Sequence, residues 1–374
     1  MSKSTMEKFH ISGPFELECG ASLPEVQIAY RTYGVLNPDA DNVTWICHAL
    51  TASADADNWW AGLFGPGNIF DPEKQFIVCA NILGSCYGTT GPASENPGTG
   101  RPYGKEFPLI TIQDMVKVHR LLRDHLGIKK VELLIGGSMG GQQALEWAVT
   151  EPDFIRNLVV LATNAKHSPW GIAFNEAQRM ALEADPTLLE NGLPEAGRKG
   201  LEAARAVAML SYRHYQAYSK TQVEPDGDKL SDFRASSYQR YQGSKLYKRF
   251  EPLSYISLSR SMDTHNVGRG RGGVEKALSS VKARTLVIGI ETDVLFPPNE
   301  QEFIAGHVPG ANFQVIDSLY GHDGFLVEFT KIAALIRPFL AGKSLKTRTK
   351  SGSKAYKSKK RLRNPKALPG SESF

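Results

Sequence analysis

With 374 residues, the chain is long enough for one large or two ordinary domains, and 41% apolar and 22% charged residues are the usage of a globular protein. This composition excludes a largely disordered chain, a collagen-like fibre and a membrane bundle. The net charge of +5 is unevenly distributed. Residues 343–374 contain 11 of the 44 lysines and arginines and one acid, Glu372, so they carry +10 and the first 342 residues carry −5.

The cysteines and the N-terminal segment indicate the compartment. Four cysteines without a C-x-x-C pair are too few for a disulfide framework in a chain of this length. The N-terminal residues lack the apolar stretch of a secretory signal, and no segment approaches the ~18 apolar residues of a membrane-spanning helix. We therefore expect a soluble cytoplasmic protein without membrane association.

Short apolar segments rich in β-branched residues alternate with helical patterns in most of the chain. Nearly continuous apolar strands are typical of a parallel sheet covered on both faces. A helix is predicted from Ile112 to Leu126, capped by Thr111 and Asp114 and ended by Gly127. The alternation predicts a doubly wound α/β fold with a mostly parallel central sheet. The predicted strands are Val43–Cys47, Gln75–Ala80, Val131–Ile135, Leu158–Leu161, Thr285–Ile290 and Phe313–Ile316.

The alternation stops between about Lys166 and Lys282, where helical patterns at residues 173–184 and 200–218 occur without an apolar strand. We predict a core in two parts, residues 1–165 and 283–342, with a helical lid inserted at residues 166–282. Residues 343–374 are predicted to be a basic, disordered tail. The tail could contact nucleic acid through phosphates, but a solvated extension is the favoured interpretation.

Residues 131–147, VELLIGGSMGGQQALEW, place the pattern G-x-S-x-G between a predicted strand and a predicted helix. This context is typical of a serine nucleophile on a sharp, strained turn, where small neighbours avoid clashes. Ser138 is the predicted nucleophile. Met139 follows at the helix N-terminus, so its backbone N–H is predicted to be one of two oxyanion donors.

The second oxyanion donor is predicted in His48-Ala49-Leu50, directly after an early strand. The backbone N–H of Leu50 is the expected donor. The His48 side chain is interpreted as structural rather than catalytic.

A serine nucleophile needs a base, and the base needs an orienting acid; in this architecture they follow in the order Ser, acid, His. Among nine histidines, His322 is the best base because it lies in a glycine-flanked loop after the last predicted strand. Asp293 is the predicted acid, since it stands just beyond the carboxyl end of a strand, where sites form in open α/β sheets. Glu291 is a close rival.

Several separated motifs make residues 10–340 resemble one known family. They are TYGVLN (32–37), CHALT (47–51), GPASENP (91–97), GGSMGGQQALEW (136–147), IAFNE (172–176) and YGHDGFL (320–326). With these motifs the chain resembles the homoserine O-acyltransferases, specifically the homoserine O-acetyltransferases, of the α/β-hydrolase superfamily. The resemblance implies an α/β-hydrolase fold with a helical lid, a homodimer, and a place in methionine biosynthesis.

The resemblance also implies the reaction and the site. An acetyl group passes from acetyl-CoA, a co-substrate rather than a bound cofactor, to Ser138 and then to the L-homoserine hydroxyl. The implied triad is Ser138, Asp293 and His322. Arg205 is implied to bind the substrate carboxylate and Asp323 its ammonium group. The sequence shows no metal-ligand spacing, so no metal site is expected. Apart from the resemblance, the residues themselves do not distinguish Arg205 from Arg213 or Arg179.

The chain departs from the family pattern near the expected acyl pocket, at Ala52, at Gln142 and within Asn81–Cys86. Small changes in a pocket redirect closely related sites. Succinyl-CoA as donor and L-serine as acceptor therefore remain alternatives. An esterase-type serine hydrolase, with water as acceptor, is a less favoured one.

Overall fold

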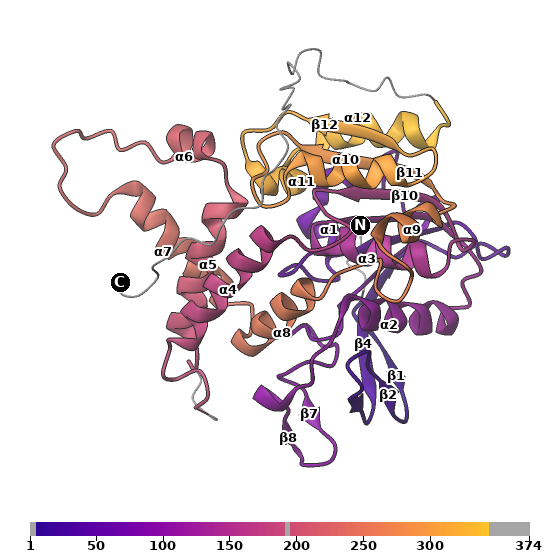
Figure 1. The fold of residues 1–374 in the computed structure, drawn as a ribbon, viewed down its shortest axis with the longest axis horizontal. Coiled ribbons are helices and arrows are strands. Elements are labelled where there is room, and N and C mark those ends of the chain that lie inside the picture. The colour runs from indigo at the N-terminus through magenta and orange to yellow at the C-terminus, as the bar shows by residue number, and fades with distance from the viewer. Residues whose placement is uncertain (1–4, 191–194, 344–374) are drawn as a thin grey trace, which may run out of the picture.

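The computed structural model describes residues 5–190 and 195–343, so the predicted basic tail lies outside the described residues except for Lys343. The described residues contain a central sheet of eight strands in the order β1-β4-β6-β5-β9-β10-β11-β12 (Figure 1). The strands from β6 to β12 are parallel, and β1 and β4 form an antiparallel edge. Their bounds are β1 (Glu7–Ile11), β4 (Val26–Tyr33), β5 (Val43–Cys47), β6 (Phe76–Ala80), β9 (Val131–Gly137), β10 (Ile155–Leu161), β11 (Arg284–Ile290) and β12 (Asn312–Ile316).

The two faces of the sheet are covered by different helices. Successive residues of a strand point to opposite faces, so Leu134 of β9 belongs to one apolar cluster and Leu133 and Ile135 to the other. The first cluster includes α2 (Ile112–His125), α3 (Met139–Thr150) and α10 (Pro298–His307). The second includes α12 (Phe329–Leu340) and the segment around α1 (Ala56–Trp59). This is a doubly wound α/β sheet, as predicted.

All six predicted strands are present, and most are longer than predicted by one to three residues at one end. The predicted helix at Ile112 begins where expected, with Thr111 and Asp114 forming a capping box. The edge strands β1 and β4 were not predicted, because several of their side chains are exposed or half-buried and interrupt the apolar pattern. Short elements complete the core: β2 (Phe15–Glu16), β3 (Ser22–Leu23), β7 (Glu95–Asn96), β8 (Arg101–Pro102), η1 (Ala61–Leu63), η2 (Gly104–Glu106), η3 (Gly321–Asp323) and α11 (Gly324–Val327).

Between β10 and β11 the described chain is helical, and it leaves and re-enters the core at neighbouring points. His167 N–H donates to the His265 carbonyl, and Val267 N–H donates to the Ala165 carbonyl. The helices between these points form the lid, which lies to the left in Figure 1. They are α4 (Pro169–Glu183), α5 (Arg198–Tyr212), α6 (Tyr215–Thr221), α7 (Arg234–Tyr247) and α8 (Pro252–Asp263); α9 (Val274–Ser279) follows and packs on α10.

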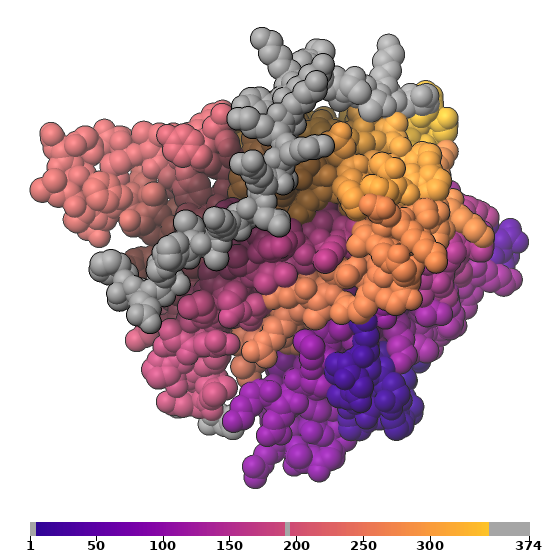
Figure 2. Space-filling model, in the orientation of Figure 1, coloured from indigo at the N-terminus to yellow at the C-terminus, as the bar shows by residue number. Residues whose placement is uncertain are grey.

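The lid differs from the sequence pattern at one point. The predicted continuous helix at residues 200–218 breaks at Arg213–His214, because His214 caps a new helix by accepting from the Gln216 N–H. The α6–α7 part of the lid projects from the body of the molecule at the left of Figure 2. Among the helices of the described ranges, none is both long and apolar enough to cross a bilayer.

Candidate active site

Ser138 occupies a strained turn between β9 and α3. Its φ of 57° is rare for a residue with a side chain and costs on the order of 1–3 kcal/mol. The turn is tight because glycines surround it: a Cβ on Gly136 would lie 2.2 Å from the Gly140 carbonyl oxygen, and one on Gly140 would lie 2.0 Å from that of Cys47. The glycines of the motif therefore let the nucleophile helix approach the end of β5.

The three side chains predicted as a triad meet in the structure. His322 Nε2 lies 2.9 Å from Ser138 Oγ, and His322 Nδ1 lies 2.7 Å from Asp293 Oδ2. Because the carboxylate can only accept, the proton of the neutral imidazole is on Nδ1, and Nε2 accepts from the serine hydroxyl. All three residues are buried, with Phe296 stacked on the imidazole ring. The arrangement can remove the proton from Ser138 as its oxygen attacks a carbonyl carbon.

The structure distinguishes Asp293 from its rival Glu291. Asp293 Oδ1 accepts from the backbone N–H groups of Leu295 and Phe296, both at 2.9 Å, which directs Oδ2 at His322. The Asp293 side chain is fully buried, whereas Glu291 is exposed. Asp293 is therefore the carboxylate that orients the His322 ring.

The residues of the two predicted oxyanion donors lie close to Ser138. Leu50 lines the same cavity as Ser138, and Met139 is the first residue of α3. Neither backbone N–H donates a hydrogen bond to another described residue. Both are therefore available to an oxygen that becomes negative when Ser138 attacks.

A cavity of about 490 Å³ opens onto Ser138 and His322. Arg205 of α5 lines it and packs over the Tyr212 ring at 5.2 Å. Its Nε is buried without a hydrogen-bond partner, and the side chain forms no ion pair among the described residues. An uncompensated, partly desolvated guanidinium is suited to bind a carboxylate in a bidentate manner.

Asp323 lines the same cavity, but sequence reasoning missed its partner. Arg213 Nε lies 2.7 Å from Asp323 Oδ2, an ion pair whose angle falls short of a hydrogen bond. The arginines of the lid were the one signal in the sequence that Asp323 could have an ion-pair partner there. No spacing rule, however, identifies Arg213 as that partner. Arg179, the other alternative to Arg205, pairs with Asp263 and does not line the cavity. The three arginines thus have different environments.

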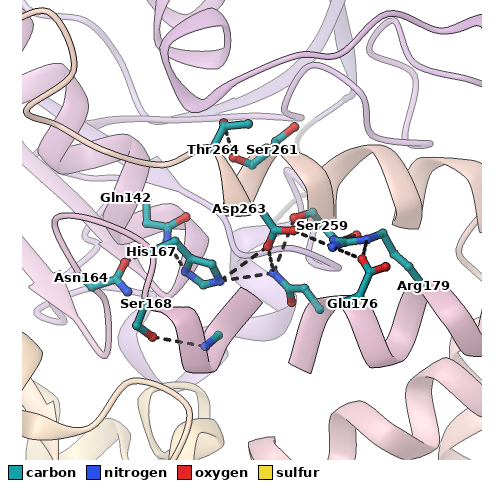
Figure 3. Close-up of polar contacts among 12 residues, drawn as sticks. Gln142, Asn164, His167, Ser168, Glu176, Arg179, Ser259, Ser261, Asp263 and Thr264 are labelled. Carbon is teal, nitrogen blue, oxygen red and sulfur yellow. Dashed lines mark hydrogen bonds and ion pairs between the residues drawn. The ribbon is translucent and has the colours of Figure 1, made fainter. Parts of the chain in front are cut away.

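A buried polar network joins the base of the lid to the nucleophile helix (Figure 3). Gln142 of α3 donates to Asn164 and contacts the ring of His167. Asp263 of α8 forms an ion pair with Arg179 of α4, whose side chain is 7% exposed. The network fixes the orientation of α4 and α8 on the core, because breaking one member leaves a buried polar group unpaired.

Glu300 lies on the core side of this junction and accepts a hydrogen bond from Asn164. Burial, the largest cause, together with the nearby charge of Asp293 raises the pKa of Glu300 to about 6. Its ionised form is therefore disfavoured in the folded protein.

The fold and the strained serine turn define the class of this protein. The sequence pattern of the alpha/beta hydrolase fold family matches residues 45–329. The chain is thus an α/β hydrolase in fold, which confirms the predicted fold class.

Individual relatives narrow the class. The homoserine O-acetyltransferase of Cyclobacterium marinum is 50% identical over 335 residues, 90% of this chain and 95% of that protein. A crystal structure of homoserine O-acetyltransferase from Bacillus anthracis has a TM-score of 0.83 at 26% identity, covering 91% of this chain and 98% of that chain. An acetylester hydrolase from Corynebacterium glutamicum has a TM-score of 0.80 at 26% identity, covering 90% and 96%. The chain belongs to the homoserine O-acetyltransferase family, as the motifs predicted.

Proposed function

We propose that this protein transfers an acetyl group from acetyl-CoA to the hydroxyl of L-homoserine through an acyl-enzyme on Ser138. The observation that carries the proposal is a hydrogen-bonded Ser138–His322–Asp293 triad. Its serine and histidine line the same cavity as the unpaired guanidinium of Arg205. Membership of the homoserine O-acetyltransferase family supports the choice of both substrates.

In the first half-reaction Ser138 Oγ attacks the thioester carbonyl carbon while His322 Nε2 takes the hydroxyl proton. The negative oxygen of the tetrahedral intermediate accepts hydrogen bonds from the Leu50 and Met139 N–H groups. The C–S bond then breaks, and the imidazolium returns its proton to the departing CoA thiolate. The Asp293 carboxylate stabilises the imidazolium throughout.

In the second half-reaction the homoserine hydroxyl takes the place of CoA. His322 Nε2 removes the hydroxyl proton as the substrate oxygen attacks the acyl-enzyme carbonyl carbon. The bond to Ser138 Oγ breaks, and Oγ regains the proton from His322. The products are O-acetylhomoserine and the free enzyme, so atoms and charges balance without a metal ion or a redox partner.

The acceptor is held by charges at two points of the cavity. Arg205 binds the homoserine carboxylate in bidentate fashion. Asp323 accepts from the ammonium group through Oδ1, since Oδ2 is paired with Arg213 and Oδ1 has no partner among the described residues. An ester hydrolase needs neither charge for its water nucleophile, so these residues favour an amino-acid acceptor.

A matrix of donors and acceptors tests the proposal. Acetyl-, succinyl- and propionyl-CoA are each combined with L-homoserine, L-serine or buffer, and CoA release and the acylated product are measured. We expect acetyl-CoA with homoserine to give the highest kcat/KM, and S138A to give no product. If acetate were released rapidly from acetyl-CoA and at the same rate with and without homoserine, the protein would be a hydrolase and the proposed transferase activity would be refuted.

We also propose a cytoplasmic location and a homodimer. The location is supported by four free thiols, among them the exposed Cys19, which suit a reducing compartment. The dimer is proposed from the resemblance to the homoserine O-acyltransferases alone. Light scattering coupled to gel filtration would test it, and a monomeric mass at micromolar concentration would exclude it.

A further inference from the structure

The peptide that carries the proposed oxyanion donor Leu50 is held from behind by the side chain of His48. His48 Nδ1 lies 2.9 Å from the Ala49 carbonyl oxygen. The Ala52 N–H donates to the same oxygen at 3.0 Å. The Ala49 carbonyl and the Leu50 N–H belong to one planar trans peptide, so they point in opposite directions. Two donors that anchor the Ala49 oxygen therefore also set the direction of the Leu50 N–H.

The proton arrangement of the His48 ring follows from its surroundings. His48 Nε2 accepts the Ile82 N–H at 3.1 Å, so Nε2 carries no proton. The remaining proton must be on Nδ1, where it is donated to the Ala49 oxygen. His48 is fully buried, and this burial lowers its pKa to about 4, which keeps the ring neutral. The bond to Ala49 is thus a fixed part of the folded protein.

A second buried side chain joins this peptide segment to the nucleophile helix. Gln143 Nε2 donates to the His48 carbonyl and to the Met139 carbonyl, both at 3.1 Å. Gln143 Oε1 accepts from His119 Nε2 at 3.0 Å, which fixes the orientation of the amide. Gln143 and His48 are 0% exposed, so water does not replace these bonds. One amide therefore connects the backbone on both sides of the predicted oxyanion hole.

We propose that His48 is a positioning residue that aims the Leu50 N–H at the oxyanion, and that Gln143 fixes the spacing between the two oxyanion donors. In this proposal His48 does not act on the acyl group directly; its ring nitrogens are bonded to the Ala49 carbonyl and the Ile82 N–H, and it acts through the peptide of Leu50. Oxyanion donors are effective only where their direction and distance are set before the reaction. Hydrogen bonding to the carbonyl of a peptide also strengthens its N–H as a donor. The inference rests on acylation of Ser138, as proposed above, but not on the identity of the acceptor.

Two substitutions separate the bonds of His48. In H48N the side-chain amide can replace Nδ1 and still donate to Ala49, but the acceptor for Ile82 is lost. In H48Q the longer side chain can replace Nε2 and accept from Ile82, but the donor to Ala49 is lost. Acylation is measured with p-nitrophenyl acetate, which needs neither CoA nor homoserine. We expect H48Q to lower kcat about tenfold to 100-fold with KM nearly unchanged, and H48N to retain most of kcat.

Controls separate positioning from folding. H265N removes another buried, neutral histidine, which donates to the Asn164 carbonyl, and should lower Tm with kcat within about twofold. Q143L should lower kcat about tenfold, and H48Q with Q143L should lose less than the product of the single losses, because both act on one segment. If H48Q does not fold, the kcat values of H48N and Q143L still test the proposal.

Three results would overturn the proposal: folded H48Q with the wild-type kcat, equal losses of kcat in H48N and H48Q, or fully multiplicative effects of H48Q and Q143L. The protein could fail to acetylate homoserine while its acylation by p-nitrophenyl acetate still depends on the bond between His48 and Ala49. That result would refute the proposed acceptor but would support the positioning role of His48.

Discussion

Replacing Asp293 by asparagine should nearly abolish activity while leaving the fold intact, and the structure shows why. Asp293 Oδ1 accepts from two backbone N–H groups at 2.9 Å, so an NH₂ group cannot occupy that position. The asparagine oxygen must take it, which directs the NH₂ group at His322 Nδ1. His322 then has to accept at Nδ1 and carry its proton on Nε2, facing Ser138 Oγ 2.9 Å away. In that tautomer it cannot accept the serine proton.

The size of the loss follows from comparable chemistry. The same substitution in serine proteases with this triad lowers kcat about 10⁴-fold through the wrong tautomer. That factor corresponds to about 5 kcal/mol of transition-state stabilisation, at about 1.36 kcal/mol for each tenfold change. Because the asparagine retains both backbone hydrogen bonds, we expect the Tm of D293N to remain within a few degrees of wild type.

The assay is the rate of acylation by p-nitrophenyl acetate, together with steady-state transfer from acetyl-CoA to homoserine. E291Q is the matched control, because it neutralises an exposed carboxylate two residues away and should change kcat less than about twofold. A folded D293N enzyme with more than a tenth of the wild-type kcat would refute the tautomer argument. A large loss in E291Q would reopen the choice of acid.

Three further predictions concern binding and stability. R205Q should lower kcat/KM for homoserine about tenfold to 100-fold by removing a charge-assisted contact of about 1.5–3 kcal/mol, with acylation by p-nitrophenyl acetate unchanged; equal losses in both half-reactions would contradict this. D263N should lower the free energy of unfolding by about 2 kcal/mol, measured in urea, because the buried Arg179 loses a partner; an unchanged midpoint would show that Glu176 alone compensates it. The folded-state pKa of Glu300, about 6, exceeds its ordinary value of 4.5, so the folded protein binds this proton more tightly than the unfolded chain does. The resulting contribution to the free energy of unfolding is fully present below pH 4.5 and is lost as the pH rises through 6. After allowance for solvent screening, E300Q should stabilise the protein by about 1 kcal/mol at pH 8 and not at pH 4, and thermal melts giving the same difference at both pH values would exclude this explanation.

Most strands of the core could be predicted from local patterns in the sequence. Parallel strands covered on both faces are apolar along their length, so β5, β9 and β11 were recognisable without any contact information. The edge strand β1 has only exposed and half-buried residues. It lacks a continuous apolar run, so the same criterion missed it. The break between α5 and α6 depends on the His214 side chain capping the backbone, and a helical period does not reveal such a contact.

The order of the site residues along the chain was also readable. A serine on a strained turn requires glycines on both sides, and the acid and the base each follow a strand end. The environment of each side chain was not readable in this way. His48 looked like an ordinary buried histidine until its ring was found against the oxygen of the Leu50 peptide.

By itself, the amino-acid sequence determined the positions of six core strands along the chain, the turn that carries Ser138 and the carboxyl-end position of Asp293, because these depend on residues close together in the chain. Only the tertiary structure decided which arginine faces the cavity with its charge free. Arg205, Arg213 and Arg179 lie in similar helical sequence, but Asp323 and Asp263 fold against the latter two from distant elements. Charge compensation depends on distances in space, and the fold alone sets those distances.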